Sequence, residues 1–97
     1  MSNSEIDILL DEIVETYEQK SPEAVLTLHN DDYNTFVHVI ACLVTYCDHD
    51  LIQAEQAAHI VHNNGKCNIK HGEYAYIFAI YKLLLAEGLT VTIDMKD

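Results

Sequence analysis

The chain has 97 residues, 49% of them hydrophobic, which allows one domain with a single core and no room for a second. Sixteen acidic residues against five basic ones give a formal charge of -11, which disfavours nucleic acid and anionic membranes as partners. Because the sequence has no run of about 20 apolar residues and no basic signal-like start, we expect a cytoplasmic protein.

The first segment has the pattern of an acidic amphipathic helix. Its apolar side chains recur at the i, i+3, i+4, i+7 spacing of one helix face, and acidic residues fill most of the positions between them. The apolar set is Ile6, Leu9, Leu10, Ile13, Val14 and Tyr17. We therefore predict an arm over residues 1–22, helical when docked, followed by a core domain over residues 23–97.

The sequence of the core domain predicts strands and helices in the order βααβαβ. Strands are expected over residues 24–29, 67–70 and 89–93, and helices over 35–47, 50–64 and 73–87. Asn34 or Thr35 is a candidate cap for the first helix, Asp50 with Gln53 for the second, and Gly65 ends the second. The fold class is α+β, with a small sheet covered by three helices.

The third predicted helix is apolar on more than one side. We expect Tyr74, Ile77, Phe78, Tyr81, Leu84 and Leu85 to face the core, which leaves Tyr76, Ile80 and Leu83 for another side. That second side is either covered by the N-terminal arm or used as a docking face.

The three cysteines, Cys42, Cys47 and Cys67, form no Cys-x-x-Cys pair, so we expect reduced and partly buried thiols. A hydrolase with Cys47 or Cys67 as nucleophile and His62 as base is a rival interpretation. Nothing in the sequence around either cysteine favours a lowered thiol pKa, so we expect no enzyme.

Two polar segments carry the main functional signal. The first is His29-Asn30-Asp31-Asp32-Tyr33-Asn34-Thr35-Phe36, between a strand-like run and a helix-like run, and the second is His59-Ile60-Val61-His62-Asn63-Asn64-Gly65-Lys66. At this spacing they resemble the ClpS family of Clp-protease adaptors, with an Asn-Thr-Phe variant similar to the second form found in cyanobacteria and plastids. The resemblance covers roughly residues 24 to 94 and implies a three-stranded antiparallel sheet.

The resemblance implies an adaptor that binds N-degrons, the bulky hydrophobic N-terminal residues of substrates, and delivers them to a Clp-type AAA+ ATPase. It assigns α-amino-group binding to Asn30, Asp31 and His62, with Asp32 in support. It also gives a hydrophobic pocket formed by Asn34, Phe36, Val39, Ala58, Val61 and Leu89. An α-ammonium has three N–H donors, and these three acceptors suit it. No cofactor or metal is implied, and acidification should weaken binding as imidazoles take up protons.

Two positions depart from the common bacterial pattern. Phe36 and Ala58 stand where methionines are usual, so we expect Phe and Leu N-termini to bind well and the Trp or Tyr preference to be altered. Glu73 matches a residue that contacts the ATPase, whereas Phe78 replaces an expected lysine on the same surface. The exposed side of the third helix is then a substitute docking surface.

Other interpretations of the same residues remain open. Taken alone, Asn30-Asp31-Asp32 is typical of a turn in which a side chain accepts backbone hydrogen bonds, and Asp32 is a possible helix cap. His59 and His62 share a helix face and form a weak metal motif with Asp31 or His29. A protein-interaction module that uses the apolar third helix, without an N-degron pocket, is the alternative function.

Overall fold

The computed structural model describes residues 22–96. Its elements are β1 (Glu23–His29), α2 (Phe36–Tyr46), α3 (Leu51–Asn64), β2 (Lys66–Glu73), α4 (Tyr74–Ala86) and β3 (Val91–Met95). They confirm the predicted α+β class and the βααβαβ order. The arm predicted over residues 1–22 falls outside the described residues, except for Pro22.

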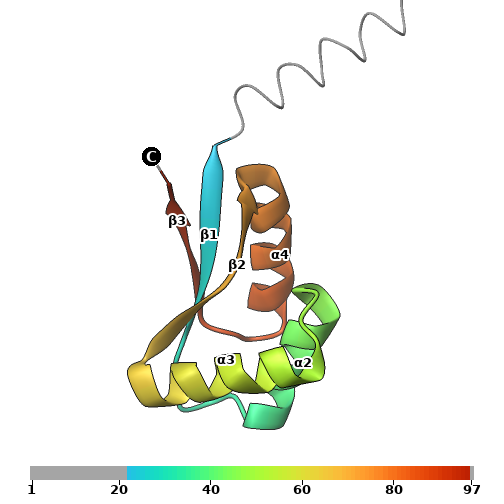
Figure 1. Cartoon of the computed structure of the whole chain (residues 1–97), viewed down its shortest axis with the longest axis vertical. Coiled ribbons are helices and arrows are strands. Elements are labelled where there is room, and N and C mark those ends of the chain that lie inside the picture. Colours follow the sequence, from blue (N-terminus) through green and yellow to red (C-terminus); the bar gives the residue numbers. More distant parts are fainter. Residues whose placement is uncertain (1–21, 97) are drawn as a thin grey trace, which may run out of the picture.

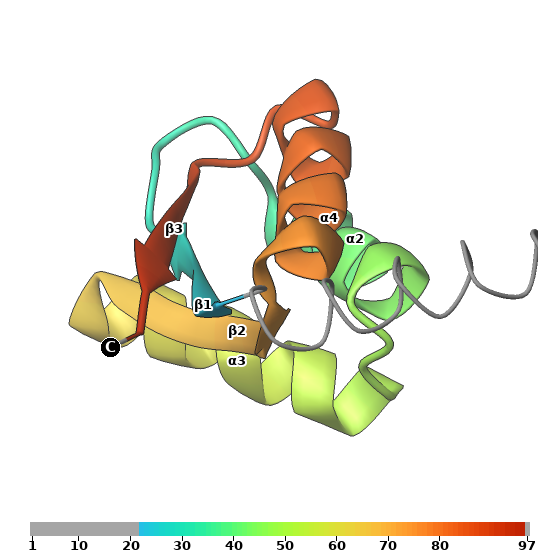
Figure 2. The ribbon, with the colours of Figure 1, turned by 90° about the horizontal axis from the view of Figure 1, so that it is seen from above.

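The described strands form one antiparallel sheet in the order β2-β1-β3. Helix α4 runs alongside the strands, and α3 lies across the end of the sheet at which β1 finishes (Figure 1). Seen from above, α4 and α3 flank β2, with α2 beside α4 (Figure 2). The polar segment that follows β1 therefore emerges beside the α2–α3 pair.

Local sequence explains where the helices begin and end. The Thr35 hydroxyl accepts a hydrogen bond from the His38 backbone N–H at 3.1 Å, and the Asp50 carboxylate accepts one from the Gln53 N–H at 2.7 Å. Gly65 ends α3 with φ 94°, a left-handed conformation that favours glycine. These are the caps that the sequence predicts.

The second strand is longer than predicted. It continues beyond residue 70 to Glu73 because its backbone pairs with β1 as far as Glu23, although Gly72 is a poor strand former. The third strand, by contrast, begins at Val91 and not at residue 89.

The core lies between the sheet and the helices. Its largest fully buried side chains include Leu26 and Leu28 from β1, Leu43 from α2, and Ile77 and Leu84 from α4. Burying each of these side chains contributes about 1.5–3 kcal/mol. No helix within residues 22–96 has both the length and the apolar character that crossing a membrane requires.

The division of α4 between core and surface differs from the prediction. Ile80, expected on the second side, is buried with Ile77 and Leu84. Three residues expected in the core are exposed, namely Tyr74, Phe78 and Leu85, and so are Tyr76 and Leu83 from the second side. A helix with apolar residues all round does not reveal which stripe its neighbours will cover. In α3 the first residue, Leu51, is also an exposed apolar side chain, at 61%.

Candidate functional site

The structure gathers most of the predicted site residues around one pocket of about 260 Å³. Every residue predicted to bind the α-amino group, to support it or to form the hydrophobic pocket lines this space. They are Asn30, Asp31, Asp32, Asn34, Phe36, Val39, Ala58, Val61, His62 and Leu89. Three further lining residues, Leu28, His29 and Thr35, were not singled out in the sequence as pocket residues. The pocket thus draws on β1, its following loop, α2, α3 and the α4–β3 turn.

Backbone hydrogen bonds fix the loop that follows β1. The Asn30 N–H donates to the Gly65 carbonyl at 2.9 Å, and the His29 N–H donates to the Thr90 carbonyl at 2.8 Å. The loop is thereby held on one side by the end of α3 and on the other by the segment that leads into β3. This anchoring brings Asn30 and His62 to the same pocket, although they lie in different elements.

Asp31 is the organising residue of this loop. Its Oδ1 accepts hydrogen bonds from the backbone N–H groups of Tyr33 at 3.0 Å and Asn34 at 2.9 Å, which is the side-chain turn expected of such a motif. Its Oδ2 accepts from the Asn34 amide at 2.8 Å and from the Thr90 hydroxyl at 2.9 Å. All four acceptor positions of the carboxylate are therefore occupied within the protein.

The same contacts control the charge of Asp31. Burial by itself would raise the pKa of this carboxyl group, but the hydrogen bonds from Asn34, Tyr33 and Thr90 favour the ionised form and leave its pKa lowered overall. A fixed negative charge consequently lies at the pocket. Thr90 was not among the predicted site residues, because a single threonine in a predicted strand has no local signal for such a contact.

Asn34 is oriented by two acceptors. Its Nδ2 donates to the Asp31 carboxylate at 2.8 Å and to the Gly88 carbonyl at 3.0 Å. Since neither partner donates, only the NH₂ group fits there, and this assigns the amide orientation. The Asn34 carbonyl oxygen is left without a hydrogen bond to any residue in the range 22–96.

Asn30 and His62 have unused hydrogen-bonding capacity. Both side chains are exposed and line the pocket, and neither makes a side-chain hydrogen bond to another described residue. The Phe36 ring lies 5.4 Å from the His62 ring and 5.1 Å from the His59 ring, centroid to centroid. Aromatic packing of this kind restricts the orientation of His62.

The inner wall of the pocket is apolar. Ala58, Val61 and Leu89 are buried, and Val39 is half-buried. Asn30, Asp31, Asn34 and His62 supply the polar groups around the same space. An apolar cavity with a few convergent polar groups is typical of a binding site for a small, partly apolar ligand group.

Glu73 lies away from this pocket. It ends β2 and pairs with Glu23 at the start of β1, whereas the pocket lies at the other end, where His29 pairs with Lys66. The exposed aromatic side chains of α4 begin next to Glu73. Tyr74, Phe78 and Tyr81 form a stacked row with ring centroids 5.7 and 6.0 Å apart.

The cysteines do not adjoin the polar groups of the pocket. Cys42 and Cys47 are buried in the core, and Cys67 is half-buried on β2. Burial raises the pKa of Cys42 and Cys67, and it raises that of Cys47 to about 11. Raised pKa values oppose the nucleophile role that the hydrolase interpretation requires.

Comparisons with known proteins agree with this architecture. The family model described as the ATP-dependent Clp protease adaptor protein ClpS matches residues 19–92. Among solved structures, Agrobacterium tumefaciens ClpS2 bound to L-phenylalaninamide superposes with a TM-score of 0.75 at 17% identity. That match covers 79% of this chain and 100% of the other. No curated protein matches.

The family match extends from before β1 into β3 and so includes both polar segments and every element that lines the pocket. At 17% identity the structural match by itself shows a shared fold. Together they confirm the resemblance inferred from the two motifs: the chain belongs to the ClpS family of ATP-dependent Clp protease adaptor proteins.

Proposed function

We propose that the pocket binds the free α-amino group and the bulky hydrophobic side chain of a protein's first residue, and that the chain delivers this protein to a Clp-type AAA+ ATPase. The observation that carries the proposal is the combination of unused acceptors at Asn30 and His62 with the apolar wall of Ala58, Val61 and Leu89 in one pocket. The acceptors meet the ammonium group, and the wall meets the side chain.

The donors and acceptors balance in this arrangement. The Asn30 carbonyl oxygen and a neutral His62 nitrogen each accept one N–H of the ammonium group, and the Asn34 carbonyl oxygen is a third acceptor on the same pocket. Asp31 contributes its negative charge at close range, because its own lone pairs are already taken by the loop. In this proposal Asp31 therefore has a supporting role, whereas the resemblance assigned it to direct binding of the α-amino group.

The pocket volume suits one side chain. About 260 Å³ lies just below the range of about 300–1,000 Å³ that is usual for whole drug-sized ligands. The ligand of the structural relative supports this assignment, since L-phenylalaninamide carries a free α-amino group, one apolar ring and an amide in place of the carboxylate. An N-terminal phenylalanine presents the same groups.

Fluorescence anisotropy with peptides that differ only at the first residue tests the proposal. We expect binding to free Phe and Leu, weak binding to a Met control, and loss of binding on N-acetylation, which removes the charge and two donors. Trp and Tyr peptides complete the ranking. If the acetylated peptide binds as tightly as the free one, the α-amino mechanism is wrong.

Paired variants locate the binding groups. Asn30→Ala and His62→Ala should each weaken binding about tenfold or more, because an unpaired ammonium donor costs about 1–3 kcal/mol. Asn63→Ala and His71→Ala are matched controls, since both residues are exposed and neither lines the pocket. Equal losses in all four variants would contradict the assignment.

The aromatic row on α4 favours this helix as the ATPase-docking surface, with Glu73 beside it: Tyr74 and Phe78 are exposed, and Tyr81 is half-buried. An adaptor needs a second surface that stays free when the pocket is filled, and Glu73 lies at the far end of β1 from the pocket. Glu73→Ala and Phe78→Ala should weaken ATPase binding and leave peptide affinity unchanged. If both variants lost peptide binding and kept ATPase binding, this surface would serve the peptide and not the ATPase.

A further inference from the structure

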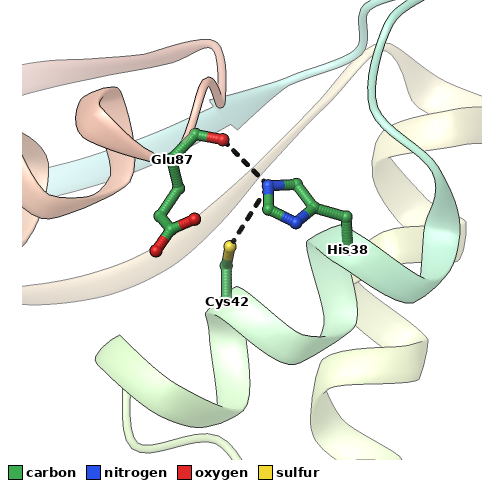
Figure 3. A group of neighbouring side chains, drawn as sticks. All are labelled: His38, Cys42 and Glu87. Carbon is green, nitrogen blue, oxygen red and sulfur yellow. Dashed lines mark hydrogen bonds between the residues drawn. The ribbon is translucent and has the colours of Figure 1, made fainter.

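A cluster of metal-ligating side chains lies outside the proposed binding pocket. His38 and Cys42 occupy successive turns of α2, and Glu87 directly follows α4 (Figure 3). One ligand atom from each lies within 4.8 Å of the others. We propose that His38, Cys42 and Glu87 form a binding site for a zinc ion.

The spacing of the donor atoms fits a tetrahedral metal. The Cys42 Sγ and His38 Nε2 atoms are 3.7 Å apart. In a tetrahedral zinc site, Zn–S and Zn–N bonds of about 2.3 and 2.05 Å place these two atoms about 3.6 Å apart. Imidazole, thiolate and carboxylate are all zinc ligands, and three protein ligands leave one position for water.

Glu87 is held in place by a neighbouring side chain. The Tyr46 hydroxyl donates to Glu87 Oε2 at 2.7 Å. Figure 3 shows the Glu87 carboxylate and the Cys42 sulfur on the same side of the His38 ring. Ligating carboxylates are commonly oriented by such an outer hydrogen bond, and the second oxygen remains available to the metal. Tyr46 is therefore a positioning residue in this proposal.

Without a metal, the three residues are linked through contacts of the His38 ring with Glu87 and Cys42. His38 Nε2 lies 2.8 Å from the Glu87 backbone carbonyl and must donate to it, because a carbonyl only accepts. Zinc binding requires the lone pair of that nitrogen, so the ring proton moves to Nδ1 and the hydrogen bond is lost. The Cys42 thiol also releases its proton to solvent as the Zn–S bond forms.

The proposed site joins two walls of the pocket. His38 precedes the lining residue Val39, and Glu87 is followed by Gly88, which binds the Asn34 amide, and by the lining residue Leu89. A metal that links α2 to the end of α4 would restrain both segments. The metal site itself does not depend on the proposed binding of N-terminal residues.

Cobalt titration of the full chain, reduced and metal-free, tests the site. Co²⁺ bound by a thiolate gives a near-ultraviolet charge-transfer band, and tetrahedral Co²⁺ gives intense visible bands. We expect both bands at one equivalent, and their loss on addition of Zn²⁺. Surface histidines alone cannot produce the thiolate band, so the band reports a bound cysteine. Its absence would overturn the proposal.

Variants assign the ligands. Cys42→Ser should abolish the charge-transfer band, whereas Cys67→Ser, which alters the half-buried thiol on β2, should retain it. Glu87→Gln and His38→Gln should weaken Co²⁺ affinity at least tenfold, and Tyr46→Phe should do so to a smaller extent. A band that survives in Cys42→Ser and disappears in Cys67→Ser would overturn the assignment.

Thermal unfolding shows whether each variant is folded and gives a second measure of metal binding. Excess Zn²⁺ should raise the Tm of the wild type, because a ligand that binds the folded state stabilises it. The rise should be smaller in Glu87→Gln, because weaker binding stabilises less, and Glu87 lies just after α4, outside the buried core. An equal Tm rise in both proteins would contradict the site.

Discussion

The Thr90 hydroxyl donates a hydrogen bond to the Asp31 carboxylate at 2.9 Å, which joins two residues 59 positions apart in the chain. This contact links the start of the last strand segment to the loop after the first strand. It works with the His29 N–H to Thr90 carbonyl bond, at 2.8 Å, to fix one side of the pocket. The geometry of the pocket thus depends on a residue from the far end of the domain.

Thr90→Val, which keeps the shape and removes the hydroxyl, should lower the free energy of unfolding by about 0.5–1.5 kcal/mol. The same substitution should weaken peptide binding, because the Asp31 loop then loses one of its four restraints. Urea unfolding and anisotropy measure the two effects. Thr92→Val is a control from β3, the strand that follows Thr90; its hydroxyl contacts His29 and not Asp31. A Thr90→Val protein with wild-type affinity would show that this restraint is dispensable for binding.

The stability of the domain should fall in acid through Asp31. The folded state holds the pKa of Asp31 below its ordinary value. The stabilisation is therefore full above the unfolded pKa and is lost as the pH falls through the lower folded pKa. Chemical unfolding at several acidic pH values should show a shallower pH dependence in Asp31→Asn than in the wild type. Asp32→Asn, whose side chain accepts no hydrogen bond within residues 22–96, is the neighbouring control. Parallel curves for wild type and Asp31→Asn would refute this.

Ala58→Met should narrow the pocket. Ala58 is only 3% exposed and lines the apolar wall, so a longer side chain must enter the cavity. Overpacking of this kind costs about 1–3 kcal/mol. We expect affinity for N-terminal Phe and Trp to fall more than affinity for Leu, measured by anisotropy. A uniform loss for all three peptides would indicate general destabilisation and contradict a steric role for Ala58.

The thiols should react slowly with alkylating reagents at neutral pH. Burial raises the pKa of Cys47 to about 11 and also raises that of Cys42, and both side chains are almost inaccessible. Mass spectrometry after iodoacetamide treatment should show Cys67 modified first, and the other two only after unfolding. If iodoacetamide alkylated Cys47 faster than it alkylates the thiol of free glutathione, the hydrolase interpretation would be supported.

The sequence by itself determined the elements, their order and the family. Helix periodicity, the caps at Thr35 and Asp50 and the stop at Gly65 are local signals, and the structure contains each of them. The family resemblance also predicted that the two polar segments would meet at one pocket, and residues of both segments line it.

Only the tertiary structure decided the contacts between distant residues. Nothing local marks Thr90 as a partner of Asp31 or Glu87 as a partner of His38, and pairing with β1 set the length of β2 against its own propensity. Packing likewise selected Ile80 for the core and left Phe78 exposed. The physical reason is that periodicity and capping act within a few residues, whereas burial and hydrogen-bond partners depend on which elements the whole chain brings together.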